Sequence, residues 1–201
     1  MMKRTVFLIL WLSSIGLAMA QNTQLKTLEL QLGAQSTVSE GYVSLKKASV
    51  YTDTEAYYYS PDIDFVYLHG KTSGANLMVP TQDQGLRAFS RTLLNKTTAW
   101  KQRNDGILVK LNQSDAKTIF DQIQSLDALK QLFTSSRNSI RTTEGYDPLL
   151  HGPGGRLTKL QAGDVILFKS NEQETYGIGY ISSIENPGTR GTLNIVLKYN
   201  L

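Results

Sequence analysis

Three segments near the end of the chain decide the fold: Val165-Ile-Leu-Phe168, Tyr176-Gly-Ile-Gly-Tyr-Ile-Ser-Ser-Ile184 and Thr192-Leu-Asn-Ile-Val-Leu-Lys-Tyr199. The first is apolar throughout, which is typical of a strand with both faces buried. The third alternates apolar and polar residues, the period of a half-buried strand. Because short polar connections separate the three segments, we expect them to pair as an antiparallel meander.

Strand patterns also occur near the N-terminus. Leu28, Leu30 and Leu32 alternate with polar residues, and residues 42–51 and 63–68 form two further β regions. In the second half of 63–68 the apolar residues fall on both faces, which favours a central strand.

The middle of the chain changes to a helical period. Residues 86–94 and 119–133 carry apolar side chains at helical spacing, and Ser125 can cap a second helix, so the latter region is one helix or two short ones. The polar, glycine-rich stretch 135–160 is expected to be mostly loop. The sequence therefore predicts an α+β fold: an antiparallel sheet or partly open barrel built from the N-terminal and C-terminal strands, with two or three helices packed on one side.

The first residues have the pattern of a secretory signal. Lys3 and Arg4 precede an apolar stretch from Val6 to Leu17, and Ala18-Met-Ala20 supplies a cleavage pattern. The apolar stretch is shorter than the roughly 20 residues needed to span a bilayer, and no later segment approaches that length. We expect residues 1–20 to be removed, leaving residues 21–201 as a single exported α+β domain in the periplasm or at the cell surface.

The charge and the cysteine content of the chain exclude several classes of partner and of chemistry. Loss of Lys3 and Arg4 lowers the net charge from +4 to +2, and there is no run of five basic residues, so nucleic acid is not an expected partner. The chain has no cysteine, which excludes disulfides and thiol catalysis. Gln21 stands where a lipid-anchored protein needs a cysteine, so direct lipid anchoring is not expected.

Metal and cofactor motifs are not evident in the sequence. His69 and His151 are far apart and belong to no zinc-binding motif, so we predict neither a metal site nor a cofactor. Ser44-Leu-Lys-Lys47 and Ser114-Asp-Ala-Lys117 both match the Ser-x-x-Lys element of penicillin-recognising enzymes. The companion motifs of those enzymes are missing, so the matches carry no prediction.

Asp62 and Asp64 are the first candidate catalytic residues. On a strand they would share a face roughly 6 to 7 Å apart, near the range for paired carboxylates in glycoside hydrolysis. Two such carboxylates are also typical calcium ligands. The alternative is that the pair belongs to a turn and that both carboxylates are simply hydrated at the start of a strand.

The segment His151-Gly-Pro-Gly-Gly-Arg156 is the second candidate. Its backbone N–H groups can face an anion, with His151 as acid or base and Arg156 as a ligand-binding clamp. It lacks the ending of a phosphate-binding loop and precedes a strand pattern, so a flexible glycine turn is the alternative.

Tyrosine is the clearest bias in composition, with ten residues, all after residue 20. Tyrosine has an apolar face and a polar rim, which suit contact with sugars, peptides and partner proteins. Tyr57, Tyr58 and Tyr59 are consecutive, so they cannot all face the core of a regular element. We take these three as the candidate ligand-binding residues, with the β-propensity of tyrosine as the alternative explanation.

Several short segments carry a resemblance to known proteins. They are Gly41-Tyr-Val-Ser-Leu45, Ala48-Ser-Val-Tyr51, Glu55-Ala56, Asp62-Ile-Asp-Phe-Val-Tyr67, Asn76-Leu-Met-Val-Pro80, Trp100-Lys-Gln-Arg-Asn104, Gly163-Asp-Val-Ile-Leu-Phe168 and Tyr176-Gly-Ile-Gly-Tyr-Ile181. In these segments the chain resembles uncharacterised exported proteins and lipoproteins of Gram-negative cell envelopes, a group with no assigned activity. The resemblance implies location and fold but no mechanism.

The sequence thus favours a non-enzymatic envelope or surface protein that binds a glycan, a peptide or an envelope protein. A hydrolase of envelope or extracellular polymers, using the paired carboxylates or the His151 loop, is the competing hypothesis. A structural subunit is a third, and it predicts a strand edge that pairs with a partner chain.

Overall fold

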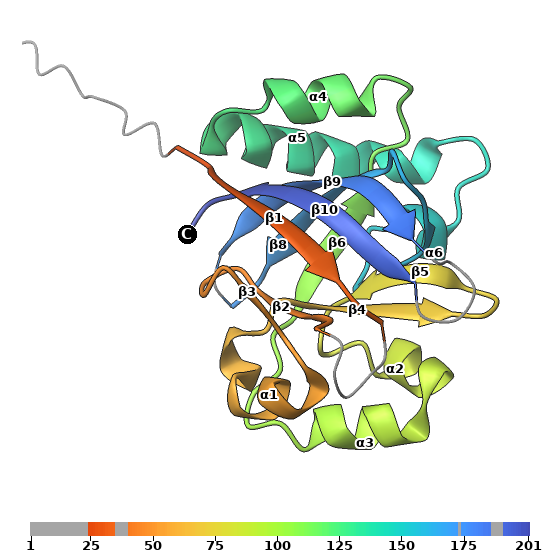
Figure 1. Cartoon of the computed structure of the whole chain (residues 1–201). Helices are drawn as coiled ribbons and strands as arrows, with labels where there is room; N and C mark the ends of the chain where they lie inside the picture. Colours follow the sequence, from red (N-terminus) through yellow and green to blue (C-terminus); the bar gives the residue numbers. More distant parts are fainter. Residues whose placement is uncertain (1–23, 35–39, 173, 186–190) are drawn as a thin grey trace, which may run out of the picture.

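The computed structural model describes residues 24–34, 40–172, 174–185 and 191–201. Within them the strands form two antiparallel sheets of five strands each, and neither sheet closes into a barrel (Figure 1). The expected α+β class is therefore confirmed. The predicted signal peptide, residues 1–20, lies outside the described residues.

The first sheet joins the two ends of the chain. Its strand order is β1-β10-β9-β8-β6, and every neighbouring pair is antiparallel, so the predicted C-terminal meander is present with β1 added at its edge. The strands are β1 (Lys26–Leu32), β6 (Gly106–Lys110), β8 (Val165–Ser170), β9 (Tyr176–Glu185) and β10 (Thr192–Tyr199).

The second sheet holds most of the N-terminal strands and one strand that the sequence did not reveal. Its order is β3-β2-β4-β5-β7, and β7 lies inside the stretch 135–160 that we expected to be mostly loop. β7 is short, and two of its five residues are Arg and Lys, so its pattern differs little from that of a polar loop. The strands are β2 (Tyr42–Ser44), β3 (Ser49–Tyr51), β4 (Phe65–Gly70), β5 (Gly74–Met78) and β7 (Arg156–Leu160).

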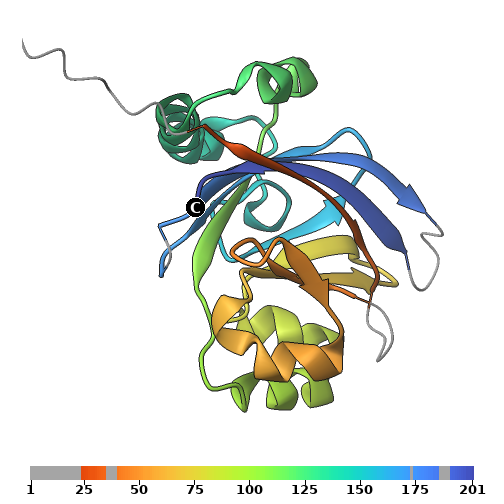
Figure 2. The same ribbon diagram turned by 60° about the vertical axis from the view of Figure 1, so that its left-hand side comes forward.

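The helices cover the outer faces of both sheets, giving four layers (Figures 1 and 2). One side of the molecule is formed by α4 (Ala116–Gln122) and α5 (Leu126–Ser139), which pack on the first sheet. Ser125 accepts a hydrogen bond from Ala128 N–H and caps α5, so the region 119–133 contains two helices. The remaining helical segments are α1 (Asp53–Tyr58), η1 (Ser60–Asp62), α2 (Asp83–Phe89) and α3 (Arg91–Thr98) beside the second sheet, and η2 (Ile140–Thr142) and α6 (Pro148–His151) after α5.

This arrangement differs from one sheet with helices on one side, and the strands show why. Ile166 and Phe168 of β8 face the other sheet, whereas Val165 and Leu167 face α4 and α5. Along β4 the side chains alternate in the same way between the inter-sheet core and the α2 and α3 side. A strand that is apolar on both faces needs cover on both faces, and here a sheet and a helical layer provide it.

Aromatic packing joins the two sheets. The rings of Phe65 on β4 and Phe168 on β8 meet edge to face with centroids 5.3 Å apart. Phe168 lies opposite Gly177 of β9, and a Cβ atom at residue 177 would lie 1.9 Å from the Phe168 ring. Gly177 thus leaves the space that the Phe168 ring occupies.

Replacing Gly177 with alanine is expected to lower the free energy of unfolding by about 3 kcal/mol, because the new methyl group overpacks a closed core. Urea denaturation of the purified protein measures this difference. Gly154→Ala is the matched control, since a Cβ atom there meets no atom within 4 Å. Equal stabilities of the two variants would contradict the packing described for Phe168.

Candidate functional site

The three candidate tyrosines lie at the end of α1, where a side-chain cap starts the helix. The Thr52 side chain accepts a hydrogen bond from Glu55 N–H, and the Glu55 carboxylate accepts one from Thr52 N–H at 2.9 Å. The Glu55 carboxylate also accepts a 2.8 Å hydrogen bond from the Thr52 hydroxyl, and the two bonds that it receives from Thr52, the backbone one foremost, lower the pKa of Glu55. Such reciprocal capping favours a helix of only six residues at this position.

Two residues, Asp53 and Ala56, anchor α1 to the second sheet and its helices. Ala56 is fully buried in the core that contains Leu86 and Trp100. Asp53, the first residue of the helix, accepts a 2.9 Å hydrogen bond from the Tyr42 hydroxyl and also pairs with Lys96 of α3. Burial, together with the Asp53 charge, raises the pKa of Tyr42. The helix is therefore fixed at its buried side and at its first turn.

The opposite side of α1 exposes aromatic rings. Tyr57, Tyr58 and Tyr59 are 54, 76 and 44% exposed. Tyr57 and Tyr58 meet edge to face with centroids 5.5 Å apart, and Tyr59 stacks on Tyr51 of β3 at 4.5 Å and 15°. We call Tyr51, Tyr57, Tyr58 and Tyr59 the tyrosine cluster. At least one of the consecutive tyrosines had to avoid the core, and in the structure all three do.

Charged groups lie around the tyrosine cluster. Partial burial raises the pKa of Tyr51, and Tyr59, Asp62 and Glu55 raise it further, while a hydrogen bond with Ser49 acts in the opposite direction. Asp62 in turn accepts a 3.0 Å hydrogen bond from Lys46. The cluster therefore combines exposed rings with two carboxylates that act on Tyr51, one of which is paired with Lys46.

Asp62 and Asp64 lie in different environments. Asp62 ends η1 and pairs with Lys46 at the surface. Asp64 is 4% exposed, and its Oδ2 accepts a 2.8 Å hydrogen bond from Leu45 N–H, while its Oδ1 has no partner among the described residues. This carboxyl holds the turn that follows β2 against the start of β4. A general acid must reach its substrate, and the burial of Asp64 works against that role.

Burial is also the main reason that the pKa of Asp64 is raised to about 7, with further contributions from Asp62 and Glu172 and an opposing one from the Leu45 hydrogen bond. In the structure the Asp64 carboxyl is thus partly protonated near neutral pH.

The glycine-rich loop His151–Arg156 connects the two sheets through backbone hydrogen bonds. Leu108 of β6 exchanges two backbone hydrogen bonds with Gly154, and Gly155 accepts one from Val79, just after β5. The His151 ring accepts a hydrogen bond from Asp147 N–H at its Nδ1 and stacks on Tyr146. These hydrogen bonds of the loop are all made within the protein.

Arg156 is held within the second sheet. Its guanidinium donates two hydrogen bonds, of 3.2 and 2.9 Å, to Asn76 Oδ1 and lies 5.4 Å from the centre of the Phe89 ring. Burial lowers its pKa. The structure therefore gives Arg156 a packing role and does not bring it to the tyrosine cluster.

Sequence reasoning missed Tyr51 as a member of the cluster, and it missed the residues that hold α1. The Thr52-x-x-Glu55 spacing is a capping-box signature and predicts the start of the helix. No spacing rule predicts that Tyr51 stacks on Tyr59 or that Lys96 reaches Asp53, because these contacts depend on tertiary packing.

Other features restrict the classes of site. In the described part of the chain, no group of three or more His, Cys, Asp and Glu side chains is arranged to hold a metal ion. None of the described helices is both long and apolar enough to cross a membrane.

Comparison with known proteins gives a fold relationship. No family model and no curated protein matches the chain. A crystal structure of a DUF4466 family protein from Parabacteroides merdae is similar, with a TM-score of 0.54 and 13% identity. The match covers 87% of this chain and 54% of that one, so the chain spans about half of the length of that protein. At this identity the similarity concerns the fold alone.

The buried carboxyl gives a pH-dependent prediction. An aspartate in the unfolded chain has a pKa near 4, whereas the folded-state pKa of Asp64 is about 7. The folded protein therefore retains this proton to higher pH, and the free energy of unfolding falls as the pH rises from about 4 through 7. Asp64→Asn keeps the acceptor for Leu45 and cannot ionise, so we expect it to exceed the wild-type stability at pH 8 by up to about 4 kcal/mol.

Denaturant unfolding between pH 4 and pH 8 measures this difference. Glu144→Gln serves as the control, because Glu144 is exposed and does not contribute to the pKa of Asp64, and this variant is expected to show the same dependence of the free energy of unfolding on pH as the wild type. If the free energies of unfolding of the wild type and of Asp64→Asn changed with pH in parallel, the pKa of Asp64 would not be raised by folding, and the prediction would be wrong.

Proposed function

We propose that this protein is an exported carbohydrate-binding protein whose contact surface is the tyrosine cluster. The observation that carries the proposal is the exposure of three consecutive tyrosines on an anchored helix. Contiguous exposed aromatic surface is uncommon on a soluble protein and marks interaction sites. Export is proposed from the signal-like pattern of residues 1–20.

The surroundings of the cluster favour a sugar over a protein partner. Protein interfaces combine aromatic residues with an apolar core from which charged residues are depleted. Here the charges of Glu55 and Asp62 act on Tyr51, and Asp62 is paired with Lys46. The remaining exposed large apolar residues in the described chain, Leu149 and Leu201, belong to α6 and the chain end. A ring face can receive the C–H face of a sugar while carboxylates and an ammonium group bond its hydroxyls.

Because α1 is anchored, the helix does not have to become ordered when a ligand binds. Asp53, Ala56 and the Thr52 cap hold the helix, so the rings are displayed before a ligand arrives. Pre-organisation of this kind reduces the entropic cost of binding.

Calorimetric titration of the exported protein with a library of soluble oligosaccharides tests the proposal. For an oligosaccharide that binds, simultaneous Tyr57→Ala, Tyr58→Ala and Tyr59→Ala changes are expected to weaken binding at least about tenfold, since three ring contacts are lost. Leu149→Ala, an exposed apolar change elsewhere, is the control and is expected to leave binding unchanged.

A double variant, Tyr57→Ala with Tyr58→Ala, keeps the Tyr51–Tyr59 stack and separates loss of binding from loss of folding. Thermal unfolding verifies that each variant is folded. Unchanged affinity in the folded triple variant, or binding of peptides but of no oligosaccharide, would refute the proposed carbohydrate surface.

A further inference from the structure

The carboxylate of Glu55 is an unneutralised negative charge at the tyrosine cluster. Glu55 is exposed, and the two hydrogen bonds that its carboxylate accepts come from the backbone N–H and the hydroxyl of Thr52, which are neutral groups. Among the described residues it forms no ion pair. The backbone bond foremost, and the hydroxyl bond with it, lower the pKa of Glu55, so the carboxylate is ionised at neutral pH.

Helix geometry places this charge beside two of the exposed rings. Residues three and four positions apart lie on the same side of an α-helix. Glu55 therefore shares a side of α1 with Tyr58, the last residue of the helix, and with Tyr59, which directly follows it. The Glu55 charge also acts on Tyr51, whose ring stacks on that of Tyr59.

Two lysines near the cluster do not neutralise this charge, because each is paired with an aspartate. Lys46 bonds to Asp62 at 3.0 Å, and Lys96 pairs with Asp53 at the start of α1. With Glu55 these groups amount to three carboxylates and two ammonium groups. The surroundings of the cluster are thus negative, on a chain whose net charge is +4.

The electrostatics of Tyr51 agree with this charge balance. The carboxylates of Asp62 and Glu55 act on its hydroxyl, whereas no lysine or arginine does. Lys47 follows Lys46 in the turn after β2, and it is not among the groups that act on Tyr51. A cation is therefore the charge that a ligand can add favourably at this surface.

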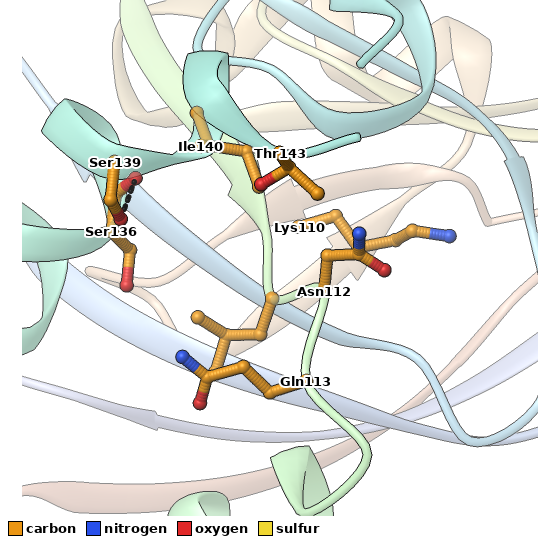
Figure 3. A pocket seen from close by; sticks show the side chains of 8 residues that line it. Lys110, Asn112, Gln113, Ser136, Ser139, Ile140 and Thr143 are labelled. Atoms are coloured by element: carbon orange, nitrogen blue, oxygen red, sulfur yellow. Dashed lines mark hydrogen bonds between the residues drawn. The ribbon is translucent and has the colours of Figure 1, made fainter. Parts of the chain in front are cut away.

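The hollow shown in Figure 3 does not offer an alternative place for a sugar. It lies between the segment that follows β6 and the end of α5, and its volume of about 50 Å³ holds a water molecule or two. A sugar ring does not fit there, so the charges at the tyrosine cluster decide which class of sugar the protein prefers.

We infer that the tyrosine cluster selects sugars that carry a protonated amine, such as glucosamine units, over neutral sugars. This inference rests on the carbohydrate-binding function proposed above. The negative face of a tyrosine ring attracts a cation. The ionised Glu55 carboxylate can in addition accept a charge-assisted hydrogen bond from the ammonium group. A neutral sugar keeps the contact with the rings but lacks both interactions.

Calorimetric titration of the full-length exported protein at pH 6 and low ionic strength tests the inference. The probes are the β-1,4-linked tetramers of glucosamine, glucose and N-acetylglucosamine, which differ only in the group at carbon 2. We expect the glucosamine tetramer to bind about fivefold more tightly than either neutral tetramer. Added salt should reduce this difference, because it screens exposed charges.

Glu55→Gln is expected to weaken binding of the glucosamine tetramer about fivefold and to leave binding of both neutral tetramers unchanged. A glutamine at this position also completes a capping box, so α1 should keep its start. Glu144→Gln is the matched control, because it removes an exposed carboxylate in the segment after η2. This control is expected to leave all three affinities unchanged.

Equal affinities for the three tetramers would overturn the inference and leave the proposed carbohydrate surface standing. An equal loss of preference in Glu144→Gln and Glu55→Gln would also overturn it, because the overall charge of the protein would then be responsible. So would a preference that survives in the folded Tyr57→Ala, Tyr58→Ala double variant. If none of the three tetramers binds, the inference is wrong, and the titration with the wider oligosaccharide library decides separately on the proposed function.

Discussion

Face-to-face packing of the two sheets is the constraint on which the rest of the structure depends. Phe65 and Phe168 meet across the interface, and Gly177 leaves room for the Phe168 ring. Because β4 and β8 are apolar on both faces, closing this interface still leaves an apolar surface on the outside of each sheet. Each outer surface then requires a helical layer.

The proposed binding surface on α1 follows from one of those helical layers. An isolated helix of six residues is not stable in water, so α1 depends on burial of Ala56 and on the contacts of Asp53 with the second sheet and α3. With one side held in this way, Tyr57, Tyr58 and Tyr59 point to solvent. On the other side of the molecule, α5 packs against the first sheet.

Local patterns predicted much of this fold. The alternation in β10 and the apolar run of β8 identified the meander, and Ser125 indicated the break between α4 and α5. The side that a helical layer covers and the partner of each strand depend on contacts between distant residues, which no local period encodes. For that reason the sequence left open one sheet or a partly open barrel where two sheets are present, and the short strand β7 was not separated from a loop.

The candidate site was predictable to a similar degree. Three consecutive tyrosines cannot all be buried on a regular element, so exposure could be predicted from order alone. The environments of Asp64 and Arg156 could not, because burial under the β2 turn and a bond to Asn76 arise only in the folded chain.

A crystal structure of the protein with a bound oligosaccharide tests the central claim most directly. The account predicts a sugar ring packed on Tyr57, Tyr58 or Tyr59, with α1 in the position it has without ligand. An oligosaccharide bound away from these rings, or an α1 that rearranges to form its contacts, would contradict it.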